Sequence, residues 1–139
     1  AKAPVIFHIQ DNEYAISTHR SQQTASSIYD MTSGYGNLSR YDVNGSDFFE
    51  TSLAFKEAVQ RARRNKGPSI IVSHVVRLLP HSSSDDQRKY RDEKALNADL
   101  KKDPLTLLES TCVSENFIMA NEFEKIRIES SIVVRSSSV

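Results

Sequence analysis

The stretch from Ser69 to Val76, SIIVSHVV, constrains the fold more than any other part of the sequence. Its density of β-branched residues is typical of a buried strand. It directly follows Gly67-Pro68, which ends an amphipathic helix pattern that Asp47 is placed to cap. On or near one face of that helix we expect a set of apolar residues: Phe49, Leu53, Val59 and Ala62.

Two more strand patterns and a short helix pattern lie earlier in the chain. Val5 to Ile9 is a continuous apolar run, typical of a parallel strand that is covered on both faces. A short helix is expected from Thr24 to Met31, with Thr24 as its cap, and a strand from Ser39 to Val43. The order strand, helix, strand, helix, strand predicts right-handed crossovers that build a parallel sheet. We therefore predict an α/β fold.

Pro80 is followed by one polar loop, and the rest of the sequence has helical patterns. Helices are expected at about Asp92 to Leu100, at Pro104 to Leu108, and from Ser114, as the cap, to roughly Ile132. We expect a sheet-containing domain and a C-terminal helix with a polar tail, at residues 1–110 and 111–139.

Composition excludes several classes of function. The 18 basic and 18 acidic side chains cancel, so no overall field attracts nucleic acid or an anionic membrane. No apolar run approaches the roughly 20 residues that span a bilayer. The single cysteine, Cys112, excludes an internal disulfide framework and fits a reducing compartment; we expect a buried thiol, with a reactive one as the alternative.

A polar turn, Asp11-Asn12-Glu13, follows the first strand abruptly. In an open parallel sheet, ligands bind outside the carboxyl ends of the strands, which is where this turn lies. An amide oxygen from Asn12 and carboxylates from Asp11 and Glu13 are hard ligands that suit Mg²⁺ or Ca²⁺, and Mg²⁺ usually keeps phosphate oxygens in its shell. The turn is therefore a candidate half-site for a metal that holds a diphosphate. The alternative is a polar turn that only stops a strand.

A second polar segment, HSSSDDQRKYR from His81 to Arg91, follows the strand Ser69–Val76 and can face the same crevice. Imidazole titrates near neutral pH, so His81 could bind a phosphate or move a proton. The acids of the loop could pair with its basic residues, although a solvated, mobile surface loop is the alternative. His8 and His74 fall within strand patterns, where a hydrogen-bonded structural histidine is the more common role. No Gly-x-Ser-x-Gly segment supports a serine hydrolase.

Three motifs in a fixed order carry a family resemblance. Asp11 to Thr18 is similar to Asn-Asn-x-Tyr-Ala-Ile-Ser-Thr, Asp42 to Asp47 to a Val-Asp-Gly-Asn-Asp turn, and His81 to Arg91 to a His-Ser-x-Ser-Asp-Asp loop closed by Tyr-Arg. Together they resemble the alpha subunit of thiamine diphosphate-dependent 2-oxo acid dehydrogenases of the branched-chain (2-oxoisovalerate) or pyruvate type. The resemblance implies the C-terminal part of a thiamine diphosphate-binding fold, followed by helices.

The resemblance also implies roles for individual residues. The side chain of Asn12 and the backbone carbonyl of Tyr14 would bind Mg²⁺, which holds the cofactor diphosphate. Ala15 and Ile16 would pack near the cofactor. His81 would contact its phosphates and assist catalysis near the reacting carbon, and Ser82 corresponds to a serine that is phosphorylated in mitochondrial members.

For the whole protein, the resemblance implies an oxidoreductase that decarboxylates a 2-oxo acid and passes the acyl group to the lipoyl arm of a partner acyltransferase. A beta subunit or beta domain would complete the site, in a heterotetramer or a dimer of fused chains. We expect it in the cytoplasm of a bacterium or the mitochondrial matrix of a eukaryote. The chain opens directly on a strand pattern and lacks the family's earlier Gly-Asp-Gly element, so we expect a piece of a longer polypeptide that is inactive alone.

The sequence departs from the family pattern near the expected diphosphate. Asp11 replaces an asparagine and Glu13 adds a second acid, while Gln10 stands where branched-chain members often have an arginine. Unless a cation offsets them, the two extra carboxylates should weaken anion binding. Asn44 replaces the acid of the middle motif. The alternative function is accordingly a degenerate, non-catalytic module for subunit assembly.

Overall fold

The computed structural model describes residues 2–137. The chain divides into two compact units between Pro104 and Leu105. Within residues 2–137, no helix is both long enough and apolar enough to cross a membrane.

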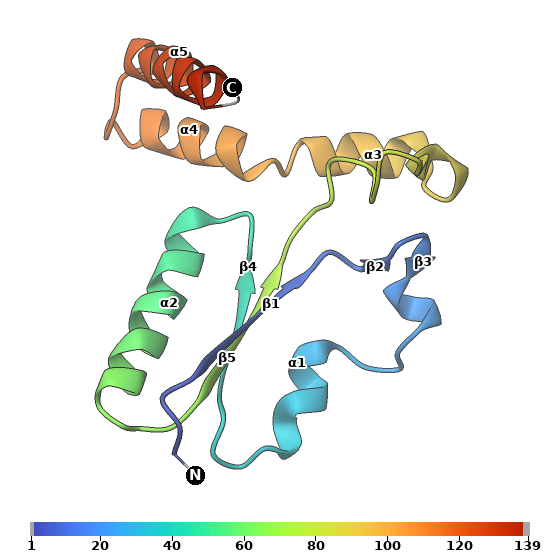
Figure 1. Cartoon of the computed structure of the whole chain (residues 1–139), viewed down its shortest axis with the longest axis vertical. Helices are drawn as coiled ribbons and strands as arrows, with labels where there is room; N and C mark the ends of the chain where they lie inside the picture. Colours follow the sequence, from blue (N-terminus) through green and yellow to red (C-terminus); the bar gives the residue numbers. More distant parts are fainter. Residues whose placement is uncertain (1, 138–139) are drawn as a thin grey trace. The chain divides into compact units, whose positions relative to one another are not determined.

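The first unit is built on a parallel sheet. Among its described residues, β1 (Ile6–Asp11) and β4 (Ser39–Asn44) both pair with β5 (Ser69–His74), which is the central strand. β5 is buried along almost its whole length, because strands cover both of its edges and its β-branched side chains fill both faces. The predicted α/β fold with a parallel sheet is confirmed (Figure 1).

Helix α2 (Phe48–Arg63) packs on one side of this sheet (Figure 1). The carboxylate of Asp47 accepts hydrogen bonds from the backbone N–H groups of Phe49 and Glu50, so the predicted cap is confirmed. The predicted apolar face is wrong at Phe49 and Leu53, which are 45% and 58% exposed, whereas Val59 and Ala62 are partly buried. The core face instead carries small residues that allow close approach to the sheet: Ala54 and Ala58, which pack against Val43 and Ile71.

The other side of the sheet is thinly covered. Helix α1 (Ile28–Met31) continues into the 3-10 helix η2 (Thr32–Gly34) and lies opposite α2 (Figure 1). It begins later than predicted, because the Ser27 hydroxyl, not Thr24, accepts the hydrogen bond that caps it, from the N–H of Asp30. The prediction that the first strand is covered on both faces is also wrong, since Phe7 is 53% exposed.

Short elements extend from the carboxyl ends of the strands. After β1 the chain forms a small antiparallel hairpin, β2 (Tyr14–Ala15) and β3 (Thr18–His19), followed by the 3-10 helix η1 (Arg20–Gln22). After β5 come a loop, the 3-10 helix η3 (Gln87–Lys89) and helix α3 (Glu93–Leu100). The carboxylate of Asp92 caps α3 through the N–H of Ala95, so this predicted helix is confirmed.

Two helices make up the described part of the second unit: α4 (Pro104–Ser114), whose first residue is the last of the first unit, and α5 (Ala120–Ser136). Pro104 is the first residue of α4, as predicted, but α4 runs past the predicted end at Leu108. The prediction that Ser114 caps the last helix is wrong, because Ser114 ends α4 and Met119 precedes α5. Cys112 is buried, as expected. The assignment of residues 1–110 and 111–139 to separate roles stays a prediction.

Candidate functional site

Two consecutive side-chain turns end β1. The carboxylate oxygen Oδ1 of Asp11 accepts a hydrogen bond from the N–H of Glu13, and the amide oxygen Oδ1 of Asn12 accepts one from the N–H of Tyr14, each at 3.0 Å. These bonds replace the sheet ladder and hold Glu13 in the left-handed region, at φ +65°. The turn is thus specified by its own side chains, and it brings Asn12 and Tyr14 together.

Arg20 neutralises part of the charge of this turn. Its Nη1 donates to Oδ2 of Asp11, and its Nη2 donates to Oε1 of Glu13 at 3.1 Å. Its backbone N–H also donates to the carbonyl of Glu13, at 2.7 Å. The side chain of Asp11 is only 6% exposed. Both acids that were candidate metal ligands therefore engage one guanidinium group.

The hairpin tip carries the next predicted residues, Ala15 and Ile16. Both are exposed, and Ile16 has φ +57°. A left-handed conformation is unfavourable for a β-branched residue, since its Cβ crowds the backbone. The conformation persists in a surrounding structure that includes Arg77, whose Nη1 donates to the Ile16 carbonyl at 2.8 Å. The hairpin thus presents a strained, exposed apolar side chain.

The ring of Tyr14 lies among cations. The guanidinium carbons of Arg77 and Arg91 are 5.2 and 5.1 Å from its centroid. Arg91 is only 5% exposed, so the last residue of the polar segment His81–Arg91 is buried. Burial is possible because Arg91 pairs with Asp99 and donates to the carbonyl of Arg77 at 2.9 Å.

A pocket of about 520 Å³ lies at the carboxyl end of the sheet. We call it the carboxyl-edge pocket; its lining includes Asn12 and Tyr14 from the hairpin, His74 from β5, and Arg91 and Lys102 from the later segment. It matches the expected position of a ligand in an open parallel sheet. Within residues 2–137, no group of three or more His, Cys, Asp or Glu side chains is arranged to hold a metal. The predicted metal ligands, the amide oxygen of Asn12 and the backbone carbonyl of Tyr14, are not among these four residue types.

A chain of hydrogen bonds joins the hairpin to the loop that contains His81. Nη2 of Arg77 donates to the hydroxyl of Tyr90, and this hydroxyl donates to Oδ2 of Asp85, both at 2.6 Å. The backbone N–H of His81 donates to the same carboxylate oxygen at 2.9 Å. The hydrogen bonds from Tyr90 and His81 lower the pKa of Asp85, while burial and Asp85 raise the pKa of Tyr90.

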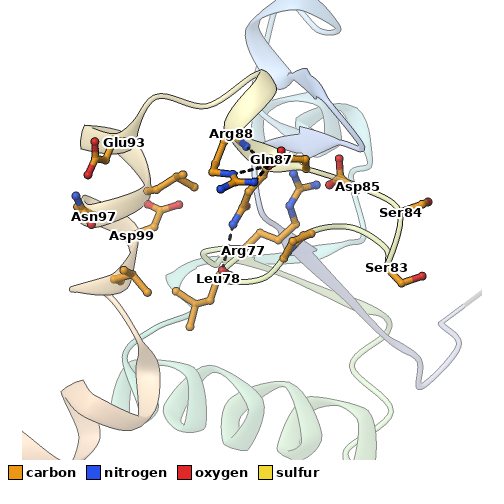
Figure 2. A pocket seen from close by; sticks show the side chains of 14 residues that line it. Arg77, Leu78, Ser83, Ser84, Asp85, Gln87, Arg88, Glu93, Asn97 and Asp99 are labelled. Carbon is orange, nitrogen blue, oxygen red and sulfur yellow. Dashed lines mark hydrogen bonds and ion pairs between the residues drawn. The ribbon is translucent and has the colours of Figure 1, made fainter.

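The side chain of His81 is exposed and is not among the residues that line the carboxyl-edge pocket. Ser82 is also exposed, and its hydroxyl lies 3.2 Å from that of Ser84. The loop borders a second pocket of about 620 Å³. Figure 2 shows Ser83, Ser84 and Asp85 on the loop, across this pocket from Glu93, Asn97 and Asp99 on α3. The structure thus ties the His81 loop to the hairpin through its backbone, while the imidazole faces solvent.

The other histidines fill structural roles, as expected for two of them. A ring nitrogen of His8 is 3.0 Å from the Ser73 hydroxyl, and one of His74 is 2.6 Å from Oδ1 of Asp42. His19, in the hairpin, lies 3.8 Å from the carboxylate of Glu13.

The sequence analysis did not find the three residues that connect the parts of the site. Arg20 pairs with Asp11 and Glu13, whereas Arg77 and Tyr90 connect the hairpin to the loop after β5. The acids of the turn were a usable signal, since two carboxylates on one short turn favour a cation nearby, above all where one of them is buried as Asp11 is. The expected pairing within the loop is confirmed at Asp86, whose carboxylate accepts two hydrogen bonds from Arg88. Nothing local marks Arg77, because both of its partners are distant in sequence.

Comparison with known proteins identifies the family of this chain. The family model described as "Dehydrogenase E1 component" matches residues 1–136. The chain is 38% identical over 134 residues to the 2-oxoisovalerate dehydrogenase subunit alpha of Bacillus subtilis, covering 96% of this chain and 40% of that protein. It is 32% identical over 130 residues to the pyruvate dehydrogenase E1 component subunit alpha of Acholeplasma laidlawii, covering 92% and 37%.

The corresponding subunit of Staphylococcus aureus is 40% identical over 105 residues, which is 75% of this chain and 28% of that protein. The chain therefore spans about two fifths or less of the length of these curated relatives. The match of the family model extends over nearly all of the chain and includes each of the three motifs. The chain belongs to the dehydrogenase E1 component family.

Proposed function

We propose that this chain is part of the alpha subunit, or alpha part, of a thiamine diphosphate-dependent 2-oxo acid dehydrogenase. The whole protein would carry out the oxidative decarboxylation of a branched-chain 2-oxo acid or pyruvate and transfer the acyl group to a lipoyl arm. The names of the relatives support the substrate class. The observation that carries the proposal is the turn at the carboxyl end of β1, which brings Asn12 and Tyr14 together beside a pocket.

The residues present fit a metal with a diphosphate. Oδ1 of Asn12 uses one lone pair on the N–H of Tyr14, and an amide oxygen has a second lone pair for a hard cation such as Mg²⁺. The Nε of Arg91 is buried and has no hydrogen-bond partner among residues 2–137, which suits a pocket that receives an anion. Asn12 and the carbonyl of Tyr14 would hold the metal, and Ala15 and Ile16 would pack beside the cofactor. When bound, the cofactor supplies the nucleophilic carbon for decarboxylation.

His81 is proposed to contact the cofactor phosphates and to hold or move a proton. Its N–H bond to Asp85 positions the start of the loop, and the exposed imidazole is available to a ligand. Phosphorylation of Ser82, which is exposed, would add about −1.5 to −2 charges beside this histidine and oppose diphosphate binding.

The whole protein would need partners. We propose a beta subunit or beta domain that completes the site, and a lipoyl acyltransferase that receives the acyl group. The assembly would be a heterotetramer or a dimer of fused chains, in the cytoplasm of a bacterium or the mitochondrial matrix of a eukaryote. This chain alone would be inactive.

A non-catalytic assembly module is the second candidate. The observation that favours it is the pair of carboxylates, Asp11 and Glu13, which line the same pocket that would receive a diphosphate. In this case the turn would keep its shape but bind no cofactor.

Calorimetry separates the two functions. The full-length protein with its beta partner and Mg²⁺ should bind thiamine diphosphate, and Asn12→Ala should weaken this binding by more than roughly tenfold. Asn97→Ala, on the exposed surface of α3, is the matched control and should bind as the unaltered protein does. An unaltered complex that shows no heat at saturating cofactor would support the assembly module and reject the enzyme.

A further inference from the structure

One guanidinium group serves both acids of the turn after β1. Arg20 pairs with Asp11 through Nη1 and with Glu13 through Nη2. Among residues 2–137, the other basic groups within 4 Å of these carboxylates are His74, with Nδ1 3.9 Å from Asp11, and His19, with Nε2 3.8 Å from Glu13. A single permanent cation therefore reduces the formal charge of this pair of acids from −2 to −1.

Arg20 also shapes the backbone between the two predicted metal ligands. Glu13 stands between Asn12 and Tyr14 in the left-handed region, a conformation that is uncommon outside glycine. Arg20 holds Glu13 at both ends, since its N–H donates to the Glu13 carbonyl and its Nη2 donates to the Glu13 carboxylate. Glu13 joins Asn12 to Tyr14, so its backbone conformation sets the orientation of these two residues.

We infer that Arg20 supports diphosphate binding through its charge, because its guanidinium group offsets the charge of Asp11 and Glu13 in the turn that carries Asn12 and Tyr14. The inference rests on the proposed function, and it explains how a turn with two additional acids can still accept an anion. The carboxyl-edge pocket includes both acids in its lining, so their charge acts directly on whatever enters.

Charge compensation predicts changes of opposite sign for two ligands. In Arg20→Gln the two carboxylates are left without their cation, so they attract a metal ion and repel a diphosphate. We expect Mn²⁺ alone, followed by electron paramagnetic resonance, to bind about threefold more tightly. Thiamine diphosphate with saturating Mg²⁺, followed by calorimetry, should bind about tenfold more weakly. A variant that only misfolds the turn would lose affinity for both ligands.

Removal of the acids supplies the rescue. The triple variant Asp11→Asn, Glu13→Gln, Arg20→Gln has no charge to offset, and asparagine at position 11 keeps an acceptor for the N–H of Glu13. We expect it to regain most of the affinity for thiamine diphosphate. The matched control is Arg63→Gln, which removes one positive charge from the exposed end of α2 and should change neither affinity. All variants are measured in the full-length protein with its beta partner.

The outcomes distinguish the inference from the function on which it rests. Binding of both ligands by Arg20→Gln at the unaltered affinities would overturn the role of Arg20 while leaving the proposed function in place. A loss of both affinities without rescue by the triple variant would overturn it too, because Arg20 would then be needed only for folding. If the unaltered complex itself binds no thiamine diphosphate, the proposed function fails, and the inference fails with it.

Discussion

The guanidinium group of Arg77 donates a hydrogen bond to the backbone carbonyl of Ile16, which lies 61 residues earlier in the chain. The same group donates to the hydroxyl of Tyr90. The hairpin after β1 and the loop after β5 are therefore connected through one side chain. A change in either segment is expected to reach the other, and this connection can be tested.

Tyr90→Phe removes the hydroxyl between Arg77 and Asp85 and keeps the ring. We expect the amides of residues 81–86 to exchange hydrogen severalfold faster, because the loop loses one of the bonds that tie it to the rest of the unit. We also expect the pKa of Asp85 to rise toward its ordinary value, since the hydrogen bond from Tyr90 is the largest cause of its lowering. Hydrogen exchange and carboxyl titration by NMR measure the two effects.

The control for this variant is Tyr35→Phe, which removes a hydroxyl from an exposed ring. Its loop amides should exchange at the unaltered rate. Equal exchange in Tyr90→Phe and Tyr35→Phe would mean that the hydroxyl of Tyr90 does not hold the loop.

The hydrogen bond between Tyr90 and Asp85 should stabilise the fold over a defined range of pH. The folded pKa of Asp85 is lowered, so its contribution to stability is complete above about pH 4 and is lost as the pH falls through the lowered value. The folded pKa of Tyr90 is raised, so its contribution is complete below about pH 10 and is lost as the pH rises through the raised value. We expect the difference in stability between the unaltered protein and Tyr90→Phe, measured by urea denaturation, to stay constant across neutral pH and to shrink only at the two extremes. A midpoint near neutrality would contradict this assignment.

Much of the fold follows from local sequence signals. The cap at Asp47, the β-branched run of β5 and the proline at the start of α4 each act through neighbouring residues, and each is confirmed. The buried face of α2 does not follow from such signals. Packing against the sheet selects small residues, Ala54 and Ala58, whereas hydrophobicity alone favours the larger Phe49 and Leu53, which are exposed.

Ile16→Gly tests whether the strained conformation at the hairpin tip contributes to cofactor binding. Ile16 is 55% exposed at φ +57°, so glycine removes a steric cost at the expense of little burial. Relief of about 1–2 kcal/mol, less the entropy cost of glycine, should leave a net gain in stability of about 0.5–1 kcal/mol. If Ile16 packs beside the cofactor, the affinity for thiamine diphosphate should fall while the melting temperature rises.

Asn65→Gly is the comparison for this variant, because Asn65 also has a positive φ but follows α2. It should gain less stability, since asparagine tolerates this conformation, and it should leave cofactor affinity unchanged. A gain in stability at Ile16 without a loss of affinity would separate the strain from binding.

Gly45→Ala should distort the carboxyl edge of the sheet. A Cβ at this position would lie 2.4 Å from Cγ1 of Val75 and 2.9 Å from the backbone carbonyl of His74, to which the N–H of Gly45 donates. We expect a loss of about 1–3 kcal/mol in the free energy of unfolding, measured by urea denaturation. Gly36→Ala, whose Cβ would meet nothing within 4 Å, is the control. Equal stability of the two variants would show that the backbone can move apart at Gly45.

The candidate site was predictable only in part. The polar turn after the first strand can be recognised in the sequence, because acid and amide side chains interrupt an apolar run. The residues that tie the following hairpin to the loop after β5 were not predictable in this way, since Arg77 and Tyr90 lie far along the chain from Ile16. The burial of Arg91 depends in the same way on Asp99, which lies on the following helix. Such contacts can be predicted only after the helices and strands have been placed relative to one another, because the two partners lie in different segments of the chain.

The central position of β5 has a consequence for synthesis of the chain. β1 and β4 do not pair with each other; both pair with β5, which is the last of these three strands to be made. While residues 69–74 are still inside the ribosome, the two earlier strands lack the template on which they align. The pairings of β5 with β1 and with β4 can therefore form only after the third strand emerges.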